Sequence, residues 1–155
     1  MIQRVSRSSV SVDDQQVGDT GVGLVVLVGI THDDTLEDAQ FIAEKTINMR
    51  VFPPEGAGTG FERSLREAGG GVLLVSQFTL YASTRKGRRP SFTAAAPAPV
   101  SEPMFQRVVD AFRDHGVPVS TGVFGAHMVV DIVNDGPVTI MLDSADRLKP
   151  RRSAE

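Results

Sequence analysis

Hydrophobic and polar residues alternate along the first part of the chain and then give way to longer apolar runs. Residues 2–12 alternate, which is typical of a strand with one buried face. The pair Asp13-Asp14 supplies turn chemistry, and residues 15–17 then begin the return strand of a hairpin. Residues 24–30 form a nearly continuous aliphatic run, which predicts a strand covered on both faces. We therefore expect a sheet with further layers above and below it.

Two segments show the three-to-four-residue spacing of amphipathic helices. The first follows Asp33, Asp34 and Thr35, which all offer N-cap chemistry, and is expected to end near Arg50. The second is expected to start at Ser101 as N-cap and to stop at Gly116 and Pro118. Because strand-like segments gather at both ends of the chain with the helices between them, the pattern predicts an α+β fold packed in layers.

The second half of the chain adds strand-like segments that are less regular. An apolar run opens the stretch at residues 72–80, and residues 117–123 and 126–133 predict two further strands. Residues 134–137 have the composition of a tight turn, and residues 138–142 predict the last strand. The whole pattern contains about six or seven strands, two helices and no internal repeat.

Composition narrows the class of protein. A length of 155 residues fits one domain, and 41% hydrophobic with 23% charged residues is ordinary for a globular protein. No apolar run is long enough to span a membrane, and the N-terminus lacks the architecture of a signal peptide, so we expect a cytoplasmic protein. The absence of cysteine excludes disulfides, thiolate nucleophiles and cysteine-ligated metals.

Charge leaves room for a local nucleic-acid contact. A net charge of −3 argues against a protein that coats nucleic acid non-specifically. One short segment nevertheless concentrates four positive side chains, namely Arg85, Lys86, Arg88 and Arg89. This segment is either an ordinary solvated loop or a lip that binds phosphates.

No set of side chains matches a familiar catalytic or metal-binding motif. His32, His115 and His127 are scattered without metal-ligand spacing, so we assign them structural roles and expect no metal or other cofactor. Ser76 lies outside any Gly-x-Ser-x-Gly elbow, which argues against a Ser-His-Asp hydrolase. No pair of acidic residues stands out as a general acid and base.

Two stretches break the local rules of strand formation. The strand at residues 72–80 runs into Ser76, Gln77 and Thr79, and burial of such groups costs free energy unless they find partners. They either cap neighbouring backbone or mark the edge of a site. At residues 134–137 a proline directly follows Asp-Gly, so the segment is either a hairpin with an awkward proline or a rigid turn that presents backbone carbonyls.

Together these stretches resemble a known family. Ser-Gln-Phe-Thr-Leu at residues 76–80 and Asn-Asp-Gly-Pro-Val-Thr at residues 134–139 are similar to the two signature motifs of D-aminoacyl-tRNA deacylases, also called D-tyrosyl-tRNA(Tyr) deacylases. The resemblance extends to residues 2–5, 87–92 and 122–128. It covers residues 1–143, which we take as the single domain, and leaves residues 144–155 as a charged tail for which we expect disorder.

The resemblance implies a fold, an assembly and an activity. It implies a three-layer α/β/β sandwich with mostly antiparallel sheets, and a homodimer with active sites at the subunit interface. The implied reaction is hydrolysis of the ester that joins a D-amino acid to the terminal adenosine of tRNA, and of glycine wrongly attached to tRNA(Ala). Gly136 and Pro137 would form a cis dipeptide that enters the partner's pocket and excludes L side chains, and Arg4 would lock that turn.

The resemblance also implies roles for the other motif. Ser76, Gln77, Phe78 and Thr79 would line the pocket, with main-chain N–H groups around Gln77 and Phe78 stabilising the oxyanion. Thr79 would orient rather than attack, because no base is placed to activate it, and the 2′-hydroxyl of the RNA would assist a water molecule. Three further residues match positions near the terminal adenosine or the pocket wall, namely Phe92, Phe124 and Met128.

Two other functions stay open at this point. One is a non-catalytic RNA-binding dimer that uses residues 85–89 for phosphates and residues 76–79 for an adenine. The other is a proofreader of a different aminoacyl-tRNA error. The unaltered Ser-Gln-Phe-Thr and Gly-Pro sequences favour the D-specific enzyme.

Overall fold

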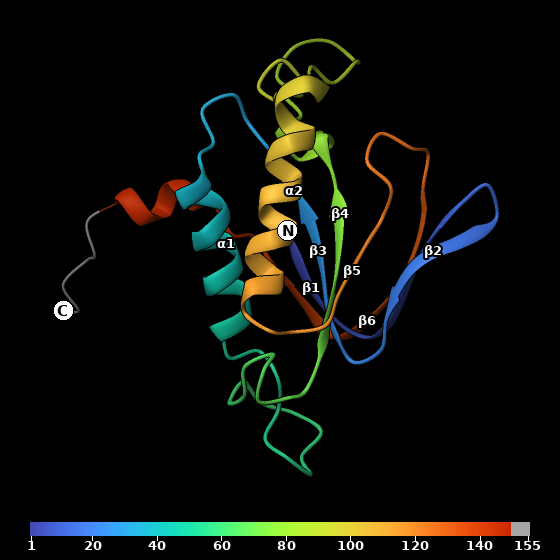
Figure 1. Ribbon diagram of the computed structural model, residues 1–155, viewed down its shortest axis with the longest axis vertical. Helices are drawn as coiled ribbons and strands as arrows, with labels where there is room; N and C mark the ends of the chain where they lie inside the picture. The colour runs from blue at the N-terminus through green and yellow to red at the C-terminus, as the bar shows by residue number, and fades with distance from the viewer. Residues whose placement is uncertain (150–155) are drawn as a thin grey trace.

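The computed structural model describes residues 1–149 as an α+β fold (Figure 1). Its strands are β1 Ile2–Val12, β2 Gln15–Thr20, β3 Gly23–Val28, β4 Gly71–Ser76, β5 Val119–Thr121 and β6 Val129–Ile140. Its α-helices are α1 Leu36–Asn48 and α2 Ala98–Asp114, and its short 3-10 helices are η1 Phe78–Tyr81 and η2 Ser144–Leu148. No helix in this described part is long and apolar enough to cross a membrane.

The strands form one curled sheet around β1. The order is β2-β1-β3-β4-β5, and β6 pairs with β1 along its other edge. Strand β1 is antiparallel to β2, β3 and β6, whereas β3, β4 and β5 run parallel to one another. The first half of β1 lies between β3 and β6, and its second half lies between β2 and β6. This arrangement confirms the predicted hairpin β1–β2 and places β4 between β3 and β5.

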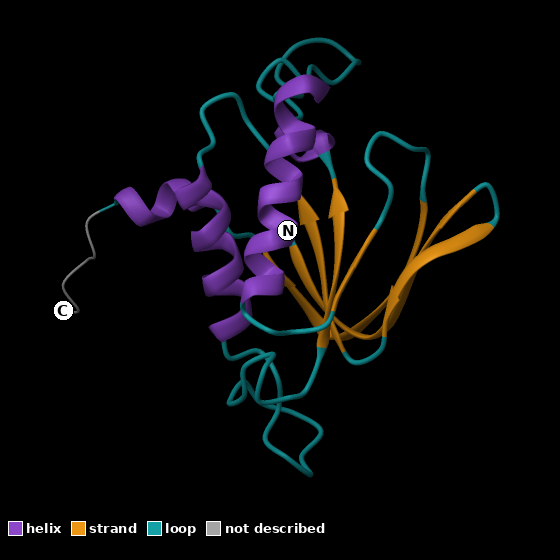
Figure 2. Cartoon of the chain, in the orientation of Figure 1, coloured by secondary structure: helices purple, strands orange, loops and turns teal. Residues whose placement is uncertain are grey.

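Two hydrophobic cores give the fold its layers. Leu24 and Val26 of β3 and Leu74 of β4 face α1 and α2, whereas Val25 and Leu73 face the opposite side, toward β6. All five side chains are buried, so the prediction that the central strands are covered on both faces is confirmed. Figure 2 shows the helices together on one side of the strands and the long loops at the ends of the sheet. These layers agree with the predicted α/β/β sandwich.

The second helix begins earlier than the sequence suggested. We expected Ser101 as the N-cap, but α2 starts at Ala98 with Pro97 in the cap position. A proline in the first turn needs no hydrogen-bond acceptor for an N–H group, which makes the Ala/Pro-rich stretch compatible with a helix start. The Ser101 hydroxyl lies inside the helix and donates to the main-chain oxygen of Pro97 at 3.1 Å. For α1 the N-cap is Thr35, one of the three candidates at residues 33–35.

The predicted turn at residues 134–137 is wrong, because β6 continues through it. Gln3 pairs with Thr139 and Val5 pairs with Asn134, so the β6 segment opposite Arg4 bulges out of the ladder while both ends stay on β1. The Asn134 side chain closes the bulge, with its Oδ1 accepting from the N–H of Val138 at 2.9 Å. The strand therefore needs no hairpin partner. By contrast, β5 spans only Val119–Thr121 and is shorter than the strand predicted at residues 117–123.

The start of the C-terminal tail carries regular structure. We expected residues 144–155 to lack it, but Ser144–Leu148 forms η2. Arg147 Nη2 lies 2.9 Å from Asp38 Oδ1 in the first turn of α1, which ties η2 to that helix. Residues 150–155 of the expected tail lie outside the described residues.

Candidate active site

The carboxyl end of β4 leaves two main-chain donors without an acceptor. The parallel ladder with β3 extends one residue past β4, because the N–H of Gln77 donates to the Val28 oxygen at 2.7 Å. The chain then turns into η1, where Leu80 and Ala82 donate back to Gln77 and Thr79. In residues 1–149, no acceptor is found for the N–H groups of Phe78 and Thr79, as expected for the first turn of a helix.

This geometry bears on which N–H groups could stabilise an oxyanion. The resemblance implies donors around Gln77 and Phe78, and the N–H group of Gln77 already donates to Val28. The available pair is therefore Phe78 and Thr79, one residue later in the chain. The signal was hidden because only the structure shows where the ladder ends and the 3-10 helix begins.

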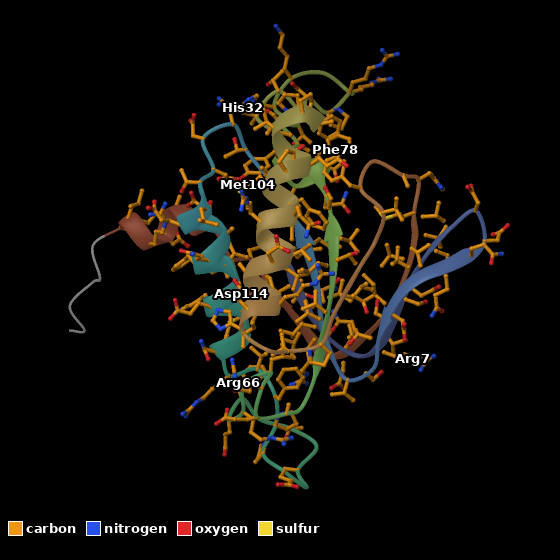
Figure 3. All side chains as sticks on the ribbon, in the orientation of Figure 1. Arg7, His32, Arg66, Phe78, Met104 and Asp114 are labelled. Carbon is orange, nitrogen blue, oxygen red and sulfur yellow. The ribbon has the colours of Figure 1, made fainter. Side chains whose placement is uncertain are left out.

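The side chains of the same segment form a polar pair and an aromatic pair. Gln77 Nε2 donates to the hydroxyl oxygen of Thr79. The Phe78 ring is 55% exposed and meets the edge of Phe92, with ring centroids 5.0 Å apart and planes at 75°. Figure 3 shows Phe78 at the upper end of β4, beside the start of α2. An aromatic pair with one exposed ring, Phe78, and one half-buried ring, Phe92, offers a stacking surface that a solvated loop would not need.

A cavity of about 510 Å³ opens beside this strand end and is lined by Ser76, Gln77 and Phe78. Its opposite wall contains Phe124 and Met128 from the loop between β5 and β6. The structure thus brings the motif at residues 76–80 together with the family-like stretch at residues 122–128. We call this space the β4 cavity.

Two parts of the β4 cavity were missed from the sequence. His127 lines it, although we assigned that residue a structural role. The start of α2 lines it through Pro97, Ala98 and Ser101, of which we expected only Ser101 at the helix start, as its cap. The signal for His127 was its position within the family-like stretch at residues 122–128. No comparable signal marked the start of α2.

The basic segment lies on a loop that is anchored next to the aromatic pair. Ser83 and Ser91 exchange two main-chain hydrogen bonds, of 2.7 and 2.9 Å, and so close a loop over residues 84–90. All four cationic side chains of this loop are exposed, namely Arg85, Lys86, Arg88 and Arg89. Because Phe92 follows directly and contacts Phe78, the loop starts and ends close to the β4 cavity.

The second predicted group of site residues surrounds the bulge of β6. The peptide bond between Gly136 and Pro137 is cis, and both residues are exposed. Buried Arg4 donates from Nε to the Asp135 oxygen at 3.1 Å and from Nη1 to the Val51 oxygen at 2.6 Å. The bulge therefore projects outward from a fixed base.

The two groups do not meet within one chain. Arg4 pairs with Leu24, whereas Ser76 pairs with Val28, four residues further along the same strand β3. At the usual rise per residue this is a separation of roughly 13 Å along the strand direction alone. Arg4, Gly136 and Pro137 are absent from the described lining of the β4 cavity.

Among the described residues, no group of three or more His, Asp or Glu side chains could hold a metal ion. The chemistry available at the β4 cavity is therefore that of main-chain donors, an amide, hydroxyls, aromatic rings and one histidine. Such a set can bind a polar ligand and stabilise negative charge on an oxygen atom.

Comparison with known proteins identifies the family. The family model described as D-Tyr-tRNA(Tyr) deacylase matches residues 1–143. The chain belongs to the D-Tyr-tRNA(Tyr) deacylase family. Relatives in this family include the D-aminoacyl-tRNA deacylase of Chloroflexus aurantiacus, 51% identical over 99% of this chain and 94% of the relative. That of Beutenbergia cavernae is 52% identical over 93% of this chain and 98% of the relative.

Solved structures agree with the fold of the D-Tyr-tRNA(Tyr) deacylase family. The chain is similar to the c-Myc DNA Unwinding Element Binding Protein, with a TM-score of 0.85 and 38% identity over 92% of this chain and 95% of the other. It is also similar to a probable eukaryotic D-amino acid tRNA deacylase, with a TM-score of 0.74 over 88% and 93% of the two chains. The identity in the second case is 19%, so that likeness concerns the fold alone.

Proposed function

We propose that the chain hydrolyses the ester bond between a D-amino acid and the terminal adenosine of tRNA. The family match and the relatives named D-aminoacyl-tRNA deacylase support this activity. The structural observation that carries it is the pair of N–H groups of Phe78 and Thr79 without acceptors at the end of β4. An ester carbonyl becomes an oxyanion when water attacks it, and two preorganised donors stabilise that charge.

In the proposed mechanism, a water molecule adds to the ester carbonyl carbon and gives up a proton with the help of the 2′-hydroxyl of the terminal ribose. The bond between the carbonyl carbon and the ribose 3′-oxygen then breaks, and that oxygen takes up a proton. Thr79 orients the substrate, since its hydroxyl already accepts from the Gln77 amide. An aminoacyl ester is labile, so positioning and oxyanion stabilisation suffice.

The proposed source of chirality is the β6 bulge at Gly136 and Pro137 of a second copy of the chain. The distance between this bulge and the β4 cavity within one chain supports a site completed by a partner. The carbonyls of the bulge would hold the α-amino group, and its rigid backbone would leave no room for an L side chain. Glycine has no side chain to exclude, so glycyl-tRNA wrongly formed on tRNA(Ala) is also a substrate.

The tRNA end would bind across the aromatic and basic surface beside the β4 cavity. Phe92, Phe124 and Met128 are proposed to contact the terminal adenine or the pocket wall. The loop at residues 84–90 would contact phosphates through its four cationic side chains.

Deacylation of matched D-Tyr-tRNA, L-Tyr-tRNA and glycyl-tRNA tests the proposed function. We expect release of D-tyrosine and glycine while L-Tyr-tRNA survives, and we expect Pro137→Ala to admit L-Tyr-tRNA because the wall loses its ring. A protein that binds tRNA in a salt-dependent manner but releases no amino acid would be the non-catalytic RNA-binding dimer instead. If Pro137→Ala discriminates as well as the wild type, the assignment of the bulge is wrong.

A further inference from the structure

A second cavity lies on the helix side of the sheet, and two residues of η1, Leu80 and Tyr81, line it. It has a volume of about 310 Å³ and lies between α1, α2, the start of β1 and the segment at residues 141–146. Its floor is apolar, with Val26, Val28, Ile42, Met104 and Val108 among the lining side chains. Figure 3 labels Met104 on α2. We call this space the α1 cavity, and it shares only Val28 and Ile30 with the lining of the β4 cavity.

The polar part of the α1 cavity is mostly acidic. Four carboxylates line it, namely those of Asp34, Asp38, Asp143 and Asp146. Asp38 is paired with Arg147, and Asp146 is paired with Lys149. For Asp34 and Asp143, no Lys or Arg lies within ion-pair distance in the described range 1–149.

The charge balance inside the α1 cavity is therefore negative. The terminal ammonium of Met1 also lines it, but that group donates to the Leu27 oxygen at 2.8 Å, and burial lowers its pKa. Burial raises the pKa of Asp34, and repulsion from Asp38 and Asp143 acts in the same direction against the hydrogen bond from Thr31. A cation between these carboxylates would relieve this repulsion.

We propose that the α1 cavity binds a small organic cation with an apolar body. The apolar floor would take the hydrocarbon part, and the cationic group would lie between Asp34 and Asp143, which line the same cavity. A neutral or anionic molecule of the same shape is not attracted to the two carboxylates. The charge of the ligand, more than its shape, therefore determines which molecules bind. The site is separate from the proposed deacylase chemistry and does not depend on it.

The position of the α1 cavity gives binding a direct reporter. Leu80 and Tyr81 line it, and both belong to η1, whose first residue Phe78 lines the β4 cavity. Tyr81 is the only tyrosine of the chain, which has no tryptophan, so intrinsic fluorescence arises from this one side chain. Occupation of the α1 cavity should therefore change the emission directly.

Three probes of one shape test the proposal on the full chain. They are 2-cyclohexylethylamine, 2-cyclohexylethanol and 3-cyclohexylpropanoic acid, titrated while Tyr81 emission and the heat of binding are measured. We expect saturable binding of the amine, at least about tenfold weaker binding of the alcohol, corresponding to one charge-assisted hydrogen bond, and none of the acid. No saturable binding of the amine by calorimetry, or equal binding of all three probes, would overturn the proposal.

Variants locate the amine. Asp34→Asn keeps an acceptor for the Thr31 N–H group but removes the charge, and Asp143→Asn does the same for the Ala145 N–H group. Each should weaken amine binding about tenfold, whereas Glu44→Gln, at an exposed position of α1 that does not line the cavity, should leave it unchanged. Unchanged amine affinity in both Asp34→Asn and Asp143→Asn would contradict the site.

Discussion

The guanidinium of Arg4 donates from Nε to the main-chain oxygen of Asp135 at 3.1 Å, and so holds the residue that precedes Gly136. The same side chain is only 4% exposed and also donates to Val51, on the loop that follows α1. A buried cation on β1 thus links the bulge of β6 to a distant loop. The β6 bulge proposed to select chirality is therefore held in place by a buried side chain and is not part of a free loop.

Replacing Arg4 should destabilise the protein. Arg4→Met leaves the oxygens of Asp135 and Val51 without their donors, at roughly 1–3 kcal/mol for each carbonyl that stays buried. Urea unfolding should show this loss as a lower midpoint. Arg7→Met is the matched control, because Arg7 lies on the same strand and is exposed (Figure 3), and it should unfold like the wild type. Equal midpoints for both variants would contradict the supporting role.

Asp38 should make stability depend on pH at the acid end. Burial alone would raise its pKa, but hydrogen bonds from the Thr35 N–H and hydroxyl groups and from Arg147 lower the pKa to about 2. A carboxyl with a depressed pKa in the folded state stabilises the fold above its unfolded pKa and loses that contribution as pH falls through the folded value. The stability difference between the wild type and Asp38→Asn should therefore be full near pH 5 and vanish between about pH 4 and pH 2. A constant difference down to pH 2 would contradict this.

Thr79 should matter little for the chemical step. In Thr79→Ala the main-chain N–H group of residue 79 stays in place, and only the hydroxyl that accepts from Gln77 is lost. We expect single-turnover deacylation of D-Tyr-tRNA within about tenfold of the wild type, the size of one hydrogen bond. Thr79→Ser, which keeps the hydroxyl, serves as the control. A loss of about 10⁴-fold or more, as for a catalytic nucleophile, would show that the hydroxyl attacks.

The basic loop should set the salt dependence of tRNA binding. Arg88→Gln with Arg89→Gln removes two exposed charges next to the Ser83–Ser91 bridge without touching the core. The slope of log affinity against log salt should then become shallower by roughly one to two, since each phosphate contact contributes ~0.7–0.9. Arg107→Gln, an exposed arginine on α2, is the control and should leave the slope unchanged. If the loop variant binds with the wild-type slope, the loop is solvated and does not contact RNA.

Local patterns predicted the parts of this fold that depend on neighbouring residues. The sequence predicts β1 from its alternation, β3 from its aliphatic run and the start of α1 from the capping residues before it. Each of these signals comes from side chains within one turn or strand. The start of α2 was not, because prolines are compatible with both a linker and a first helical turn. The sequence predicts a tight turn where β6 has a bulge, because only pairing with β1 on both sides of it distinguishes the two.

The candidate site was predictable in its residues but not in its geometry. The two motifs pointed to Ser76, Phe78 and Gly136, yet the register that places them far apart depends on strand pairings over long sequence separations. Strand β4 ends at Ser76, but the N–H group of the next residue, Gln77, still donates to β3. Among the described residues, the first N–H groups without an acceptor are therefore those of Phe78 and Thr79. The homodimer stays a prediction.

The central claim is that one copy supplies the β4 cavity and a second copy supplies the Pro137 wall. Two variants separate these parts: Ala98→Trp blocks the cavity with an indole at an exposed position of its lining, and Pro137→Ala removes the wall. Alone, Ala98→Trp should be inactive, and Pro137→Ala should hydrolyse both D-Tyr-tRNA and L-Tyr-tRNA.

The most direct test is to titrate an excess of Ala98→Trp into Pro137→Ala, allow subunits to exchange, and measure hydrolysis of both substrates. In each mixed dimer the open cavity of one copy faces the intact Pro137 of the other. The account predicts that hydrolysis of L-Tyr-tRNA falls toward zero while that of D-Tyr-tRNA persists. A ratio of D to L hydrolysis that stays constant throughout the titration would contradict it.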